Sequence, residues 1–211
     1  ARRQRQMCIR DRVSGTDGAF STRRGNMVKL RDVLQAAIDK TGAIMAKKSP
    51  DLPERAAVAR DVGVGALVWN SLYNGRIKDV VFDWDAVLNF DGETGPYVQY
   101  THARACSVLR KARPAGEVDY AALDDGESRA LLSALAAFPS AVAEAAEKYE
   151  PYLVSRAVMA VCQAFNRFYY ERRIMADDPA VRNARLALTD AARRVIAIGL
   201  GLLGMKAPER M

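Results

Sequence analysis

Histidine and cysteine are scarce in this sequence of 211 residues. It has one histidine, His102, and three scattered cysteines, Cys8, Cys106 and Cys162. These numbers exclude a disulfide scaffold and a zinc site built from cysteine and histidine. They fit a reducing compartment, so we expect a cytoplasmic protein.

Long apolar runs are also missing. The run Val195–Met205 is too short to cross a bilayer, and no charged-then-apolar leader opens the chain. We therefore expect neither a membrane partner nor a secretory signal. Half of the residues are apolar and 27% are charged, which is enough apolar material for a folded core and too little charge for global disorder.

The net charge of +7 is confined to the N-terminus, because residues 1–31 hold nine basic and two acidic side chains. The body of the chain is neutral, so a site for a polyanion must come from local arrangement. Residues 1–14 carry five arginines without a helical or strand period. We interpret them as a basic tail foreign to the native protein; the alternative is an RNA-binding arm.

Helical periodicity dominates the rest of the sequence, which predicts a mainly α fold with a helical bundle in its second half. We expect a break at Pro139, a helix start at Asp178 and Pro179, and a short extended piece near 77–82 followed by a helical turn over 86–90. Helices are expected over residues 30–45, 54–73, 97–112, 127–149, 151–173 and 179–203.

A loop and a helix could bind nucleotides. In the loop 20–26, the hydroxyls of Ser21 and Thr22 and the cations of Arg23 and Arg24 suit a polyphosphate, although a solvated turn is the alternative. On the helix after Pro96, Tyr100, Arg104 and Lys111 lie together outside the core face, with Tyr97 at its border. An exposed aromatic beside cations suits an unpaired base; packing against a neighbouring helix is the alternative.

The segment Phe165–Arg173 interleaves aromatics with arginines. We expect Phe165, Phe168 and Tyr169 in the core, while one of the tyrosines could instead face RNA. Elsewhere the sequence offers no self-contained catalytic group and no metal site. His102 points to a different side of its helix from Tyr100, and Cys106 and Cys162 lie in apolar helical stretches as small core residues.

Several motifs, in order, resemble arginyl-tRNA synthetases, which are class I aminoacyl-tRNA synthetases. The segment Asp91–Arg104 resembles the start of that family's anticodon-binding domain, and Phe20–Asn26 resembles its version of the KMSKS loop. Residues 62–66, 76–79 and 82–85 resemble its connector helices. Asp190–Arg193 matches the D-A-L-R signature apart from Ala192, and residues 204–211 resemble the family's C-terminus.

The resemblance implies a fold and a reaction. The enzyme joins arginine to tRNA(Arg) through arginyl-adenylate, using ATP with Mg²⁺ as a substrate and no tightly bound cofactor. Ser21, Thr22, Arg23 and Arg24 are then the catalytic loop that stabilises the departing pyrophosphate. Lysines of the class signature are replaced here by Ala19 and Thr22. The anticodon-binding residues implied by the family pattern are Tyr97, Tyr100, Arg104, Tyr169 and Met211.

This resemblance divides the chain into three parts. Residues 1–14 are the tail, 15–93 the end of a Rossmann-type catalytic domain with the KMSKS-like loop and connector helices, and 94–211 a DALR-type helical anticodon-binding domain. The H-x-G-H motif is absent, so we expect a C-terminal fragment of the ligase, inactive alone and monomeric. The alternative is a stand-alone, non-catalytic tRNA- or RNA-binding helical module.

Overall fold

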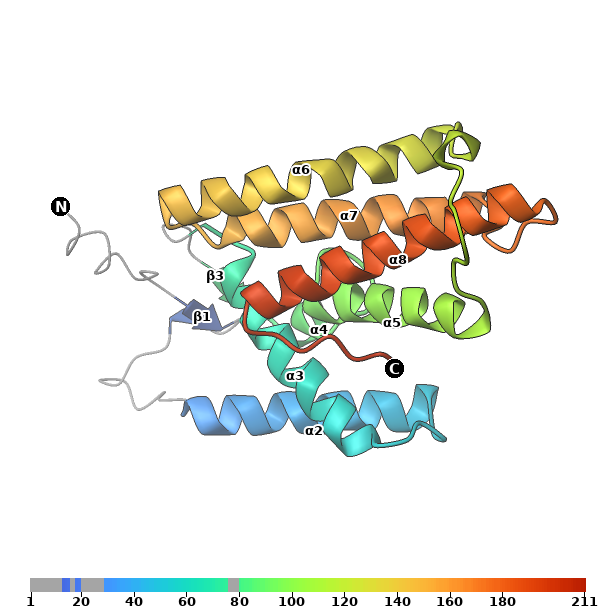
Figure 1. The fold of residues 1–211 in the computed structure, drawn as a ribbon. Helices are drawn as coiled ribbons and strands as arrows, with labels where there is room; N and C mark the ends of the chain where they lie inside the picture. The colour runs from blue at the N-terminus through green and yellow to red at the C-terminus, as the bar shows by residue number, and fades with distance from the viewer. Residues whose placement is uncertain (1–12, 16–17, 20–28, 76–79) are drawn as a thin grey trace.

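The computed structural model describes residues 13–15, 18–19, 29–75 and 80–211, and over these it is mainly helical, as predicted (Figure 1). The helices of the first part are α2 (Leu30–Lys48), α3 (Arg55–Leu72) and the short α4 (Trp84–Val87). The second part consists of α5 (Gly95–Lys111), the 3₁₀ turn η2 (Tyr120–Ala122), α6 (Gly126–Lys148), α7 (Tyr152–Glu171) and α8 (Pro179–Leu202).

Helices α5 to α8 form a bundle around one apolar core. Phe165 and Phe168 on α7 are fully buried, as are Leu131 on α6 and Ile196 on α8. Trp69 of α3 joins the same core, and its indole N–H donates to the carbonyl of Glu93 at 2.9 Å. Because α3 contributes to the bundle core, the connector helices and the bundle pack together.

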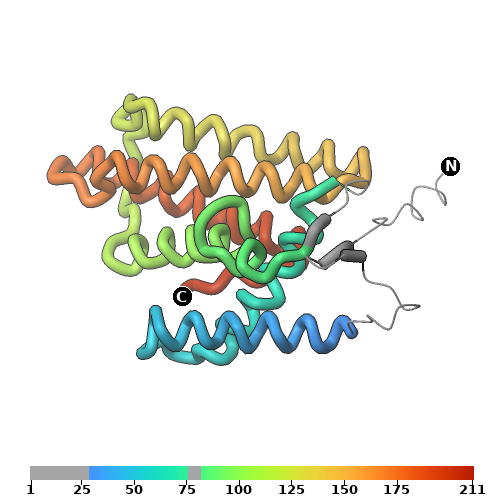
Figure 2. The backbone as a smooth tube through the Cα atoms, turned by 180° about the vertical axis from the view of Figure 1, so that it is seen from behind, coloured from blue at the N-terminus to red at the C-terminus, as the bar shows by residue number. Residues whose placement is uncertain are grey.

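Helices α2 and α3 form a hairpin along one side of the bundle, and the C-terminal tail runs between this hairpin and α5 in both views (Figures 1 and 2). Gly63 permits the close packing of the hairpin, because a Cβ there would lie 2.7 Å from the carbonyl oxygen of Ala37. The loop between the two helices carries Pro50 and Pro53, and proline disfavours the continuation of either helix.

A small sheet lies beside the connector helices. Strand β1 (Val13–Gly15) pairs antiparallel with β2 (Gly18–Ala19) and parallel with β3 (Val80–Phe82). Residues 13 and 14 of the expected tail are thus part of a strand. The division of the chain at residues 14 and 93 stays a prediction.

Helix starts follow the sequence signals closely. The carboxylate of Asp178 accepts from the backbone N–H groups of Ala180 and Val181 at 2.7 and 3.3 Å, and Pro179 begins α8. Asp83 caps α4 in the same way, and this helix covers residues 84–87 rather than 86–90.

The expected break at Pro139 is wrong, because α6 continues through this residue. Pro139 lies on the exposed face of α6, where water can satisfy the carbonyl that loses its N–H partner.

Helix α6 meets the length and apolar composition of a membrane-crossing helix, the only one to do so among the described residues. Its buried side chains, which include Leu131, Phe138 and Ala145, pack on one side against the bundle core. The opposite side is rich in alanine. The apolar composition of α6 is therefore that of an outer helix of a bundle, with one side buried in the core and alanines on the other.

Candidate nucleic-acid interface

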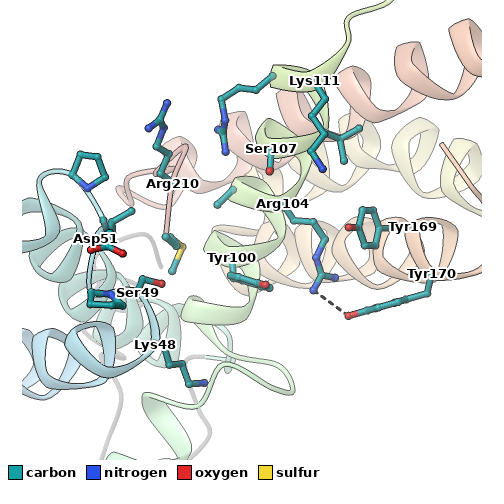
Figure 3. A pocket seen from close by; sticks show the side chains of 17 residues that line it. Lys48, Ser49, Asp51, Tyr100, Arg104, Ser107, Lys111, Tyr169, Tyr170 and Arg210 are labelled. Atoms are coloured by element: carbon teal, nitrogen blue, oxygen red, sulfur yellow. Dashed lines mark hydrogen bonds between the residues drawn. The ribbon is translucent and has the colours of Figure 1, made fainter. Parts of the chain in front are cut away.

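A pocket of about 900 Å³ opens where four segments of the chain meet (Figure 3). The segments are the α2–α3 loop from Lys48 to Pro53, the exposed flank of α5, the end of α7 and the C-terminal tail. We call it the tyrosine pocket, after the residues that mark it: Tyr100, Arg104, Tyr169, Tyr170, Arg210 and Met211.

The walls of the tyrosine pocket are strongly basic. Among the described residues that line it, one side chain is acidic, that of Asp51. Five are cationic: Lys48, Arg104, Arg110, Lys111 and Arg210. Because the body of the chain is neutral overall, this is a local concentration of positive charge. Such a pocket attracts a polyanion in a manner that weakens as salt rises.

Arg104 lies at the centre of an aromatic cluster. Its guanidinium carbon is 5.0 Å from the ring centres of Tyr100, Tyr169 and Tyr170, within the range of cation–π attraction. Its Nη2 also donates to the hydroxyl of Tyr170 at 3.1 Å (Figure 3). The three tyrosines remain 41%, 37% and 70% exposed, so part of each side chain is accessible to a ligand.

A buried amide behind the pocket fixes the direction of Arg104. Asn166 on α7 accepts from Nη1 of Arg104 at 2.5 Å. Its Nδ2 donates to the hydroxyls of Tyr97 and Thr101, both at 2.9 Å. Since every hydrogen-bonding group of Asn166 is engaged, the guanidinium is held in one direction before any ligand arrives.

The structure brings four of the five predicted anticodon-binding residues to one pocket: Tyr100, Arg104, Tyr169 and Met211. Tyr97 lies behind it, half-buried, with its hydroxyl on Asn166. Burial raises the pKa of Tyr97 and outweighs the lowering effect of the Asn166 hydrogen bond, so its hydroxyl stays neutral. That these residues contact RNA stays a prediction, and the predicted catalytic residues Ser21, Thr22, Arg23 and Arg24 lie outside the described residues.

Phe165 and Phe168 are buried as predicted, but the expectation of a core Tyr169 is wrong, because its ring is partly exposed in the pocket. Arg210 and the α2–α3 loop were not foreseen as parts of this site, whereas Tyr170 is one of the two tyrosines of Phe165–Arg173 of which one was expected as a candidate to face RNA. The interleaved aromatic segment signalled Tyr170. The spacing of Arg210 and the loop along the chain carries no such signal, because they reach the pocket through tertiary packing.

The cysteines and the histidine of the described residues are buried in the fold. Cys106 and Cys162 are buried, as predicted, and burial raises the pKa of both thiols. His102 is 2% exposed and faces the C-terminal tail, away from Tyr100. Within the described ranges, no group of three or more histidine, cysteine or carboxylate side chains could hold a metal ion.

Comparisons with known proteins match both parts of the chain. Residues 98–211 match the DALR anticodon binding domain, and residues 11–84 match the catalytic domain of class I (R) tRNA synthetases. The chain belongs to the arginyl-tRNA synthetase family. Its DALR domain contains the helices that contribute Tyr100, Arg104, Tyr169 and Tyr170 to the tyrosine pocket.

Relatives with known names agree with this assignment. The chain is 45% identical over 201 residues to the arginine–tRNA ligase of Halothermothrix orenii and 46% identical to that of Clostridioides difficile, covering 94% of this chain in both cases. Its structure resembles that of Thermus thermophilus arginyl-tRNA synthetase with a TM-score of 0.87 and 35% identity, over 94% of this chain and 34% of the other. The chain spans about 36% of the length of the curated relatives.

Proposed function

We propose that the tyrosine pocket binds unpaired bases of the anticodon loop of tRNA(Arg). The observation that carries this proposal is the arrangement around Arg104, where three partly exposed tyrosine rings surround one fixed cation. Unpaired bases stack on such rings, and the lysines and arginines of the rim neutralise the adjoining phosphates. The match of residues 98–211 to an anticodon-binding family supports the choice of RNA as the ligand.

We also propose that the whole protein is an arginine–tRNA ligase. In this reaction arginine attacks the α-phosphorus of ATP, pyrophosphate leaves, and the activated arginine passes to the terminal ribose of the tRNA. ATP with Mg²⁺ and arginine are substrates of the complete enzyme. Ser21, Thr22, Arg23 and Arg24 would stabilise the negative charge that develops on the departing pyrophosphate. The protein acts in the cytoplasm as a monomer.

A ligase fragment is better supported than a stand-alone RNA-binding module. The match of residues 11–84 to a synthetase catalytic domain is the relevant observation, because a stand-alone module has no use for such a segment. The 211-residue chain itself is proposed to be inactive, since its sequence has no H-x-G-H motif. Arginine-dependent ATP–pyrophosphate exchange by the purified chain would contradict this statement.

Fluorescence anisotropy with a labelled tRNA(Arg) transcript tests the binding proposal. The chain is titrated at low and moderate salt, beside a transcript in which the central anticodon base is changed. Tighter binding of the native anticodon, with affinity that falls as salt rises, supports anticodon recognition. Equal affinity for both transcripts contradicts it. A circular dichroism melt of the same sample establishes that the chain is folded.

A further inference from the structure

The last six residues follow a defined path along α5. Gly204, with a φ of +73°, turns the chain after α8, and Met205 anchors the turn in the core. From there residues 206–211 run beside α5 and end in the tyrosine pocket, where Arg210 and Met211 line the wall. Met211 also packs on a cluster of Met45, Ala59 and Val62.

Three side chains of α5 bind the backbone of this tail. Gln99 donates to the carbonyl of Lys206 at 2.9 Å, His102 to that of Pro208 at 3.0 Å, and Arg110 to that of Glu209 at 2.9 Å. At 100° per residue these three positions fall within an arc of about 80°. They form one ridge, directly beside the flank that carries Tyr100 and Arg104.

His102, like Gln99, does not line the pocket, whereas Arg110 does. A carbonyl can only accept, so Nδ1 of His102 carries the proton that it donates to Pro208. The thiol of Cys106, 3.7 Å from Nε2, can donate to the other nitrogen. Gln99 does not bind the tail alone, because its Nε2 also donates to the carbonyl of Asp61 on α3 at 3.2 Å.

We propose that Gln99, His102 and Arg110 are positioning residues that hold the tail 206–211 as a wall of the tyrosine pocket. Without them the tail loses its fixed path, and Met211 leaves the base-binding surface. The effect on RNA is exerted through the tail, because His102 is buried beneath it. The link to RNA affinity rests on the proposed function; the docking of the tail does not.

Two variants of His102 test the proposal. His102→Asn retains an N–H at nearly the position of Nδ1, whereas His102→Leu retains apolar volume without a donor. Limited trypsin digestion measures docking directly, through cleavage after Lys206. Cleavage after Arg173, whose exposed side chain lies in the α7–α8 loop, is the internal control for unfolding elsewhere. The same samples are titrated with the labelled tRNA(Arg) transcript.

We expect His102→Leu to release residues 207–211 about 3- to 10-fold faster and to weaken tRNA binding by a similar factor, the value of one lost hydrogen bond. His102→Asn should restore both, and cleavage after Arg173 should not change. Equal release from both variants overturns the positioning role. If the parent chain binds tRNA, and His102→Leu releases residues 207–211 faster without a change in tRNA affinity, the link between the tail and the pocket is overturned. If the parent chain binds no tRNA, the proposed function fails, and the trypsin result alone still decides how the tail is held.

Discussion

The side-chain oxygen of Asn166 accepts a hydrogen bond from Nη1 of Arg104, which joins α7 to α5 behind the tyrosine pocket. Asn166 is buried, whereas the rings that surround Arg104 are partly exposed. A polar group in the bundle interior therefore determines the geometry of a surface site. This arrangement is the preorganisation that lowers the entropic cost of binding a ligand.

Replacement of Asn166 by leucine should remove one of two hydrogen-bond partners of Arg104, which keeps Tyr170, and should remove the Asn166 bond to the hydroxyl of Tyr97. We expect a loss of about 1–3 kcal/mol in the free energy of unfolding and weaker tRNA binding. Asn166→Asp is the matched control, because it keeps an oxygen for Arg104 and should retain more of the affinity. Urea denaturation and anisotropy measure the two effects, and equal affinity of both variants would contradict the role of Asn166.

Truncation of the pocket tyrosines should weaken RNA binding with little effect on folding. We expect Tyr100→Ala and Tyr169→Ala each to cost about 1–3 kcal/mol of binding free energy. Tyr120→Ala is the control, since Tyr120 is also exposed, at 67%, but does not line the pocket. If the control weakens anisotropy-monitored binding as much as the pocket variants do, the tyrosine pocket is not the RNA site.

His102 should make stability depend on pH. Burial lowers its pKa below the ordinary value of 6.5; nearby Arg193 lowers it further, while the bond to Pro208 and nearby Glu209 oppose the shift. The unfolded chain then binds a proton below pH 6.5 that the folded chain resists. Stability from the neutral ring is present above this pH and is lost as the pH falls toward the folded pKa.

Denaturation midpoints measured from pH 7.5 to 5.5 test this dependence. The chain has no other histidine, so His102→Asn should remove most of the slope in this interval. If the denaturation midpoint of the variant still changes with pH to the same extent, groups other than His102 cause the pH dependence.

Asp125 joins three helices at one end of the bundle. Its carboxylate accepts from the backbone N–H of Ser128 at 2.9 Å as the cap of α6, and it pairs with Arg185 at 3.3 Å and Arg172 at 3.4 Å. Partial burial alone would raise its pKa, but the Ser128 hydrogen bonds and the two arginines together lower it below 3.8. The ionised form thus contributes stability above about pH 4 that is lost as the pH falls toward the lowered pKa.

Asp125→Ala should lower the free energy of unfolding by about 1–3 kcal/mol at neutral pH, through the lost cap and the unpaired Arg185. Asp119→Ala, at the cap of the short η2 turn, is a control that should cost less. Urea denaturation at pH 7 compares them, and a smaller loss at Asp125 than at Asp119 would contradict the importance of this ion-pair network.

Pro139 should limit the stability of α6. Pro139→Ala restores a backbone N–H in the helix interior and should raise the free energy of unfolding by about 1–3 kcal/mol. Ser140→Ala, on the same exposed face, is expected to change it by less than about 0.5 kcal/mol. Thermal melts of the two variants decide this point; no gain at Pro139 would mean that the helix already accommodates the missing bond without cost.

Local chemistry made most of the helices predictable. Asp178 and Pro179 predicted the start of α8. The spacing of apolar residues in α5 assigned Val98 and Thr101 to the core face, and Tyr100 and Arg104 to a flank outside it. Pro139 shows the limit of such rules, because one missing hydrogen bond on an exposed face did not end a helix whose other side is buried. Tyr169 shows a second limit, since an aromatic residue beside a core position can lie at the rim of a pocket.

The sequence by itself determined the mainly helical class, the resemblance to arginyl-tRNA synthetases and the pairing of Tyr100 with Arg104 on one helix flank. These features depend on residues that are near one another in the chain. The tertiary structure alone decided that Asn166 fixes Arg104, and that the α2–α3 loop and residues 206–211 complete the same pocket. Asn166 and Arg104 are 62 positions apart, and Gln99 and Lys206 are 107 apart. Contacts at such separations form only when the packed core brings their helices together.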